Sequence, residues 1–239
     1  MLDSELCLPE TGVFCLTCNI CGSDDFDAFR GRPGELCRDC GSLARHRIAF
    51  AVYEHHLFTL EEDEHSLRVL HLAPEPCLQP ALDEVIGSGY ICADASPERY
   101  PHAECLKLYF PKDFKIFPES YFDAVLHNHV LEHIPGHFGD HLIDFARLLK
   151  PGGRMIFSVP GPYKKRLTEE GGEHLKTDAE RLEKFLQEDH YKMFGADFVE
   201  FLRQMPGGFL VPDGITNELR AKLNVRPNKA PFFIWEKQL

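Results

Sequence analysis

Four cysteines near the start of the chain have the spacing of a metal site. Cys18 and Cys21 form one pair, and Cys37 and Cys40 form a second pair after fifteen intervening residues; each pair is followed directly by glycine. Four thiolates fill the tetrahedral shell of zinc and leave no position for water. The spacing therefore predicts a structural zinc site rather than a catalytic one.

Other readings of these cysteines stay open. Cys15 forms a further C-x-x-C with Cys18, and a redox-active pair or free buried thiols would also produce clustered cysteines. Glycine tolerates the positive φ that brings the following amides round, which favours the pairs that glycine follows. In a reducing compartment, such a cluster holds a metal more often than disulfides. A module this small has little core of its own, so we expect its folding to depend on zinc.

A second group of residues that could bind a metal or transfer protons is His129-Val-Leu-Glu132-His133. It matches the H-x-x-E-H pattern of inverted zinc peptidases. Those enzymes present the motif on one face of a long helix. Here Pro135 and Gly136 end any helix almost at once, and an apolar strand precedes the motif. We therefore expect acid–base chemistry rather than peptidase chemistry. A second zinc lost with His133 would favour the peptidase.

The elements that position these residues alternate between strands and helices from residue 67 onwards. Short apolar strands are predicted at 67–73, 89–94, 121–128 and 154–160, and amphipathic helices at 76–88 and 137–150, the latter stopped by Pro-Gly-Gly at 151–153. Repeated units of this length predict an α/β fold with a mostly parallel sheet and helices on both faces. Ligands on such sheets bind at the carboxyl ends of the strands.

The flanking segments are less distinctive. Apolar spacing predicts a connecting helix from about 43 to 57, with Ser42 as its cap. Within it, Arg45, His46 and Arg47 either line a binding surface or are simply solvated or paired. The charged segment 164–176 is read equally well as a lid or as a solvated loop. Helices at 178–187 and 196–204 and an antiparallel pair of strands at 208–212 and 231–237 complete the pattern. The predicted domains are 1–47, a zinc-ribbon module with its lead-in, and 48–239, an α/β domain in which 164–206 form a lid or an insertion at the ligand site.

Composition limits the class of protein. The 239 residues carry a net charge of −12, and 44% are hydrophobic, which is typical of a globular protein. No stretch approaches the length of a transmembrane helix, and the acidic N-terminus does not resemble a signal peptide, so a cytoplasmic protein without membrane contact is expected. The acidic balance disfavours nucleic acid as a partner.

A family resemblance becomes visible in the combined motifs. An acid after the second strand, FDAVLHNHVLEHI and ARLLKPGGRMIFSVP, in that order, resemble class I S-adenosylmethionine-dependent methyltransferases. More closely, CNICGS, CRDCGSLARHR, VLHLAPE, HVLEHI and EDHYKMFGADF resemble a bacterial subgroup with a zinc-ribbon front end that is associated with polysaccharide and other carbohydrate biosynthesis. The resemblance covers about residues 18–210 and implies a Rossmann-like class I sheet preceded by the zinc ribbon.

The resemblance also implies where S-adenosylmethionine binds. Asp94 would accept both ribose hydroxyls, and the loop from His71 to Glu75 would lie under the methionine part, although HLAPE lacks the glycines of the usual D-x-G-x-G loop. The alternative for Asp94 is a turn or helix-cap acid. The implied cofactor-binding residues are His71, Leu72, Ala73, Glu75, Asp94, Ala95, Glu104, Cys105, Leu106, Asn128 and His129.

The implied reaction is methyl transfer to a hydroxyl, or less readily an amine, of a small acceptor such as a saccharide. Alignment supplies much of the rate, and a base helps a hydroxyl react. His129 is the first candidate base and His190, within EDHYKMFG, the second, with His133 nearby. The alternative is that these histidines pack or make structural hydrogen bonds.

Two further functions remain as alternatives. Zinc modules precede some RNA methyltransferases, but the first 47 residues hold five arginines against eight acids, a net charge of −3, which disfavours RNA. The glycine-free loop could also mark a methyltransferase-like scaffold that no longer binds the cofactor. Calorimetry with S-adenosylmethionine separates the scaffold from the enzyme.

Overall fold

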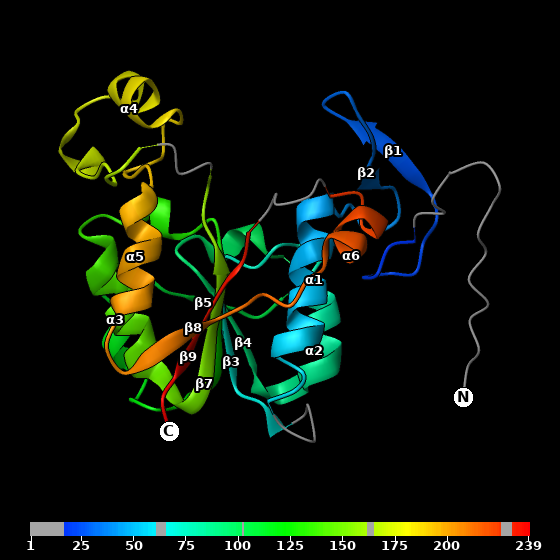
Figure 1. Ribbon diagram of the computed structural model, residues 1–239, viewed down its shortest axis with the longest axis horizontal. Helices are drawn as coiled ribbons and strands as arrows, with labels where there is room; N and C mark the ends of the chain where they lie inside the picture. Colours follow the sequence, from blue (N-terminus) through cyan, green and yellow to red (C-terminus); the bar gives the residue numbers. More distant parts are fainter. Residues whose placement is uncertain (1–16, 61–65, 102, 162–164, 226–230) are drawn as a thin grey trace.

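The centre of the molecule is a seven-stranded sheet (Figure 1). The computed structural model describes residues 17–60, 66–101, 103–161, 165–225 and 231–239. Across the sheet the order is β5-β4-β3-β6-β7-β9-β8. The strands are β3 (Val69–Leu72), β4 (Tyr90–Asp94), β5 (Cys105–Lys107), β6 (Phe122–Asn128), β7 (Leu149–Ser158), β8 (Gly208–Val211) and β9 (Phe233–Lys237).

The first five strands across the sheet are parallel, and β9 runs antiparallel between β7 and β8. The order in which successive strands are added to the sheet reverses between β3 and β6: β4 and β5 are added on one side of β3, and β6 and β7 on the other. A crevice forms outside the carboxyl ends at such a switch point. This topology confirms the predicted Rossmann-like α/β sheet, including its antiparallel pair.

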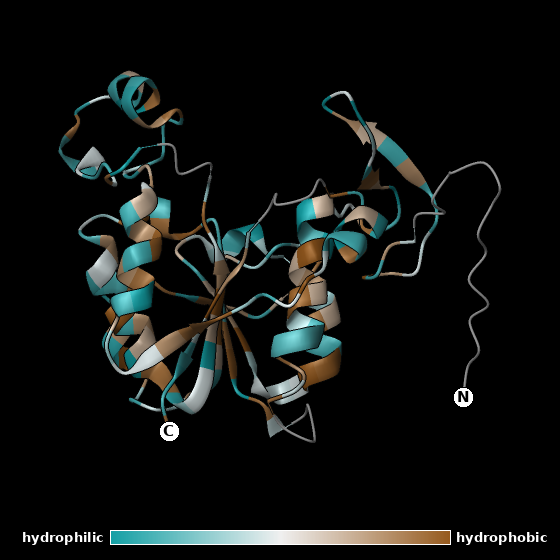
Figure 2. Cartoon of the chain, viewed as in Figure 1, coloured by the Kyte–Doolittle hydropathy of each residue, from teal (hydrophilic) through white to brown (hydrophobic). Residues whose placement is uncertain are grey.

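Two apolar layers cover the sheet, one on each face. α1 (Ala44–His56) and α2 (Gln79–Ile86) pack on one face, and α3 (Phe138–Leu148) and α5 (Ala196–Gln204) on the other (Figure 1). Figure 2 shows the hydrophobic colours concentrated on the strands between these helices. All seven residues of β6 are buried, as expected for a central parallel strand with both faces covered. The molecule therefore buries its core on both sides of the strand that precedes His129.

The predicted start of the fourth strand is wrong. Instead of beginning at residue 154 after a helix to 150, the structure ends α3 at Leu148 and begins β7 at Leu149, which pairs with Phe122. Gly153 lies where an added Cβ would be 2.9 Å from the Asp123 carbonyl oxygen. The Pro-Gly-Gly run is thus part of an irregular start to β7, where the register against β6 shifts between the Phe122–Leu149 and Ala124–Arg154 pairs.

The cysteine-rich module consists of a small hairpin, β1 (Phe26–Phe29) and β2 (Arg32–Cys37). α1 follows immediately and crosses the predicted boundary between residues 47 and 48. Its side chains Ile48, Val52 and Tyr53 are fully buried against the sheet, so α1 is part of the α/β core and not only a connector. The predicted cap is also wrong: Leu43 is the N-cap, and its N–H donates to Nδ1 of His46 at 3.2 Å.

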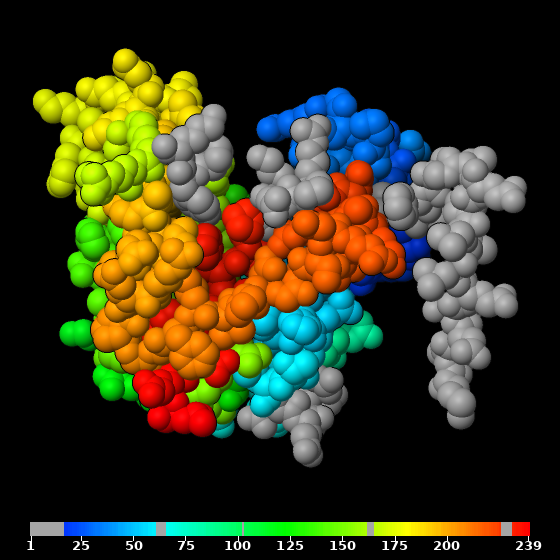
Figure 3. Space-filling model, in the orientation of Figure 1, coloured from blue at the N-terminus to red at the C-terminus, as the bar shows by residue number. Residues whose placement is uncertain are grey.

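Two segments project beyond the carboxyl ends of the parallel strands. One is the β1–β2 hairpin, and the other carries α4 (Asp178–Phe185) between β7 and α5; Figure 3 shows a gap between them. α6 (Asn217–Lys222) packs beside α1, and short 3-10 turns occur elsewhere, among them η5 (Leu131–His133). Among the described residues, no helix is both long and apolar enough to cross a bilayer.

Candidate metal centre and active site

The four paired cysteines converge on one point. Cys18 Sγ lies 3.7 Å from Cys40 Sγ, and Cys21 Sγ lies 3.6 Å from Cys37 Sγ. One ligand atom from each of the four lies within 4.8 Å of all the others. Four sulfurs at about 2.3 Å from zinc would be about 3.8 Å apart. The donor set and its spacing therefore fit a closed tetrahedral zinc ion. Cys7 and Cys15 lie outside the described residues.

Two tight turns aim the thiols inward. Gly22 and Gly41 have φ values of +77° and +71°, and their N–H groups donate to the carbonyls of Cys18 and Cys37 at 2.8 and 3.0 Å. Burial alone raises the pKa of the Cys18 thiol, but hydrogen bonds from Ser42 and from nearby backbone amides outweigh burial and lower the pKa to about 7. Ser42, predicted as a helix cap, thus supports a thiolate instead.

Arg47 fastens this module to the α/β domain. Its fully buried guanidinium donates to four backbone carbonyls at 3.2 to 3.4 Å, those of Gly34, Glu35, Ser42 and Leu223. Three of these carbonyls belong to the cysteine-rich module, and the fourth follows α6. Of the two roles considered for this residue, the structure supports pairing and not a binding surface.

We expect Arg47→Ala to lower the free energy of unfolding by about 3–5 kcal/mol, because it leaves several carbonyls without a donor and a cavity in place of a fully buried side chain. Urea unfolding followed by circular dichroism measures the change. Arg38→Ala is the matched control, since Arg38 is 55% exposed and its ion pairs are on the surface; the expected change is about 1 kcal/mol or less. Equal effects of the two substitutions would contradict this role of Arg47.

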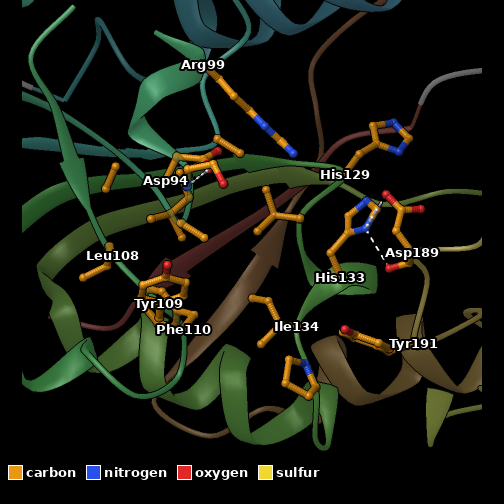
Figure 4. A pocket seen from close by; sticks show the side chains of 17 residues that line it. Asp94, Arg99, Leu108, Tyr109, Phe110, His129, His133, Ile134, Asp189 and Tyr191 are labelled. Carbon is orange, nitrogen blue, oxygen red and sulfur yellow. Dashed lines mark hydrogen bonds and ion pairs between the residues drawn. The ribbon is translucent and has the colours of Figure 1, made fainter. Parts of the chain in front are cut away.

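A cavity of about 540 Å³ opens at the carboxyl ends of β3, β4 and β6, at the switch point of the sheet. Small-molecule sites commonly have volumes of about 300–1,000 Å³. Figure 4 shows Asp94 and Arg99 toward one end, and His129, His133, Asp189 and Tyr191 toward the other. The cavity thus joins a carboxylate end to an imidazole-rich end.

Asp94 lies at the last position of β4 and lines the cavity. Its Oδ1 accepts a hydrogen bond from the Ser96 N–H at 2.7 Å, and its Oδ2 accepts one from the Tyr100 hydroxyl at 3.0 Å. A carboxylate has about four lone-pair sites, so two remain for a ligand. The two internal bonds hold the carboxylate in place and leave a lone pair free on each oxygen.

The loop after β3 takes a form that explains the missing glycines. Ala73 adopts a φ of +48°, a conformation that glycine usually supplies, and its N–H donates to the Ala93 carbonyl at 2.9 Å. Leu72 and Ala73 line the cavity. The smallest side chain other than hydrogen thus stands where the backbone turns beside the cavity, at a strain cost of about 1–3 kcal/mol.

His71 and Glu75, at the two ends of the loop, are outside the cavity lining. His71 is fully buried, contacts the Tyr90 hydroxyl at 2.8 Å and lies 3.4 Å from the Glu75 carboxylate. Burial alone raises the pKa of Glu75, but His71 and His46 outweigh burial and lower the pKa. These two implied ligands therefore support the loop instead of facing the cavity.

The implied segment Glu104–Leu106 also lies outside the cavity lining. The register of β5 explains why, because Asp94 pairs with Lys107 and the strand reaches its carboxyl end there. Leu108, Tyr109 and Phe110, just beyond that end, line the cavity instead. Sequence reasoning placed this edge a few residues early because three-residue β5 lies within an irregular stretch. Ala95, as implied, lines the cavity.

Asn128 and His129 point in different directions. The Asn128 amide donates to the Tyr53 hydroxyl at 2.8 Å and accepts from the Ser158 hydroxyl at 3.0 Å, which ties β6 to α1 and β7 beneath the cavity. His129 has a φ of +53°, lines the cavity and lies 3.3 Å from Glu132 through its Nδ1. Only His129 of this pair can meet a ligand in the cavity.

The segment after β7 supplies further lining residues. Asp189 and Tyr191 face the cavity, and Asp189 engages Nδ1 of His133 through its carbonyl at 3.1 Å and its carboxylate at 3.4 Å. His190 turns the other way, is buried, and lines an adjacent hollow of about 190 Å³. Of the three candidate bases, His129 and His133 face the main cavity and His190 does not.

The H-x-x-E-H motif is not on an α-helix. It spans a left-handed residue at 129 and a single 3-10 turn, η5. His129 and His133 therefore do not occupy one face of a long helix, as the peptidase arrangement requires.

A family model described as "Methyltransferase domain" matches residues 45–202. That range begins in α1, ends in α5 and includes every residue that lines the cavity. No curated protein matches the sequence.

Solved structures with similar folds include three methyltransferases. One, a SAM-dependent methyltransferase from Archaeoglobus fulgidus, is 15% identical with a TM-score of 0.49 over 81% of this chain and 94% of that one. Another, an S-adenosylmethionine-dependent methyltransferase from Mesorhizobium loti, is 14% identical with a TM-score of 0.49 over 80% and 100%. The third, 1,6-didemethyltoxoflavin-N1-methyltransferase from Burkholderia thailandensis, is 16% identical with a TM-score of 0.48 over 82% and 79%. Likeness at this level says nothing of the acceptor.

Proposed function

This chain belongs to the methyltransferase-domain family, and we propose that it transfers a methyl group from S-adenosylmethionine to a hydroxyl of a small, carbohydrate-related acceptor. The observation that carries the proposal is the cavity at the switch point, which joins the Asp94 carboxylate to His129. The carbohydrate class rests on the zinc-ribbon motifs of the sequence and on the polar, imidazole-rich end of the cavity.

The cavity fits the donor by the chemistry of its lining. Asp94 would bind the ribose diol, and the apolar side chains of Leu108 and Phe110 would pack against the adenine. Ala73, with its close backbone turn, would lie beside the methionine part. S-adenosylmethionine supplies an electrophilic methyl group on a positively charged sulfur.

His129 would act as the general base that accepts the hydroxyl proton of the acceptor. It is 46% exposed, which leaves its ring accessible from the cavity, and Glu132 lies 3.3 Å from Nδ1. With Nδ1 oriented toward that carboxylate, Nε2 is the nitrogen that would accept the hydroxyl proton. The acceptor oxygen then forms a bond to the methyl carbon as the carbon–sulfur bond breaks, and the electron pair of that bond stays on sulfur.

We expect His129→Gln to reduce the rate of methylation by about 100-fold or more while leaving affinity for S-adenosylmethionine within about threefold, because a general base acts on the acceptor. The rate is measured with isotopically labelled S-adenosylmethionine and a metabolite extract, by mass spectrometry of labelled products; calorimetry gives the affinity. His174→Gln is the control, because His174 is exposed and outside the cavity lining. Unchanged methylation by His129→Gln would remove this residue from the mechanism.

The same extract experiment tests the function as a whole. A labelled small hydroxylated product supports the proposal. Labelled RNA as the only product would replace it with RNA methylation, and failure of the zinc-loaded protein to bind S-adenosylmethionine would leave the scaffold as the better account.

A further inference from the structure

A second cluster of metal-ligating side chains lies in the wall of the cavity, apart from the four cysteines. Glu132, His133 and His190 each offer a ligand atom, and these atoms lie within 4.8 Å of one another. A backbone hydrogen bond from the Tyr191 N–H to the Glu132 carbonyl, 2.8 Å long, brings the two segments together. The cluster lies between the main cavity, which His133 lines, and the smaller hollow, which His190 lines.

The burial of Glu132 indicates that this cluster binds a cation. The residue is 1% exposed, and neither carboxylate oxygen has a hydrogen-bond partner among the described residues. Oε1 lies 3.3 Å from Nδ1 of His129. Lys192, the nearby buried cation, donates instead to the Ile134 carbonyl. A buried carboxylate without hydrogen bonds is costly unless it binds a cation.

The two imidazoles are suited to complete such a site. Asp189 engages one ring nitrogen of His133, the arrangement that commonly orients a metal-binding histidine and leaves the other nitrogen for the metal. His190 is buried beside this ring, and its ring nitrogen lies within the same 4.8 Å group of ligand atoms. The ring centroids of His133 and His190 are 4.8 Å apart.

We propose that Glu132, His133 and His190 bind a divalent transition-metal ion such as Zn²⁺, with a remaining coordination position open to the cavity. Three donors around zinc at about 2.1 Å lie about 3.4 Å apart, so the side chains close by at most about 1.4 Å when the ion binds. Unlike the four-cysteine centre, three protein ligands leave room for a water or for an oxygen of the acceptor. Only the identity of that oxygen rests on the proposed function; metal binding itself does not.

This site differs from the one that the H-x-x-E-H pattern would predict. It uses the glutamate and the second histidine of the motif, but His190 from a distant segment takes the place of His129. Glutamate serves here as a ligand, not as the base of a peptidase.

Zinc stoichiometry of the full chain tests the proposal. After equilibrium dialysis against buffered Zn²⁺, elemental analysis should give two zinc ions per chain for the unmodified protein. Glu132→Gln, which preserves side-chain size, and His190→Ala should each weaken the second equivalent by at least about tenfold and leave the first in place. His174→Ala, at an exposed histidine outside the cluster, should retain both.

A single zinc in the unmodified protein, or a second zinc that persists in both Glu132→Gln and His190→Ala, would overturn the site. S-adenosylmethionine binding by the same samples, measured calorimetrically, shows whether each variant is folded and reports on the proposed function separately. A protein that binds the nucleoside but only one zinc would refute the metal site and leave the methyltransferase proposal standing.

Discussion

Replacing Asp94 with asparagine should weaken S-adenosylmethionine binding by about 100-fold. The substitution keeps the shape of the side chain but removes its charge and one acceptor oxygen. Hydrogen bonds to a charged group contribute about 1.5–3 kcal/mol each, and the carboxylate has a free lone pair on each oxygen for the ribose diol. Asparagine must also present an NH₂ group to one of two existing donors, the Ser96 N–H or the Tyr100 hydroxyl. Isothermal titration calorimetry measures the dissociation constant.

Glu98→Gln is the matched control. It removes a carboxylate from the same loop, but Glu98 is exposed and does not line the cavity. We expect its affinity to stay within about threefold of the unmodified protein, because exposed charges contribute little. If Asp94→Asn binds S-adenosylmethionine as tightly as Glu98→Gln, the ribose does not lie on Asp94.

Loss of zinc from the four-cysteine centre should unfold the hairpin module. Within residues 17–43, the buried apolar side chains are Cys18, Cys37 and Leu43 alone, which is too little core for independent stability. Structural zinc contributes about 10–16 kcal/mol of binding free energy in small modules, so Cys37→Ser should lose one zinc per chain and amide protection across β1 and β2. Elemental analysis and hydrogen exchange measure the two effects.

Cys105→Ser provides the control, since it removes a partly buried thiol that is remote in sequence from the cluster and is not one of its four ligands. It should retain the full zinc content and a protected hairpin. Retention of hairpin protection in Cys37→Ser protein that has lost this zinc would show that packing through Arg47 alone holds the module. The structural role assigned to zinc would then be wrong.

The sequence predicts the sheet well because its strands carry strong local signals. Apolar runs bounded by turn residues mark β3, β4 and β6, and the two glycines after the cysteine pairs do adopt positive φ. Asp94 ends its strand as expected, because a carboxylate is costly within a buried apolar strand and is tolerated at its end. These features depend on residues that are close together in the chain.

Features that depend on register or distant contacts were not predictable in the same way. The cavity edge at Leu108–Phe110 follows from the pairing of Asp94 with Lys107, which no local pattern reveals. Asn128 supports the fold through Tyr53, 75 positions away, and His190 faces away from the cavity although its neighbours Asp189 and Tyr191 face into it. A turn, in which the His190 N–H donates to the Gln187 carbonyl, sets the direction of these side chains, so motif membership alone does not assign a role.

A crystal structure of the protein soaked with S-adenosylhomocysteine tests the central claim most directly. The account predicts the nucleoside across the ends of β3, β4 and β6, with both ribose hydroxyls within about 3.2 Å of the Asp94 carboxylate and the sulfur directed toward His129. A cavity filled by its own side chains, or a nucleoside bound with its ribose away from Asp94, would contradict it.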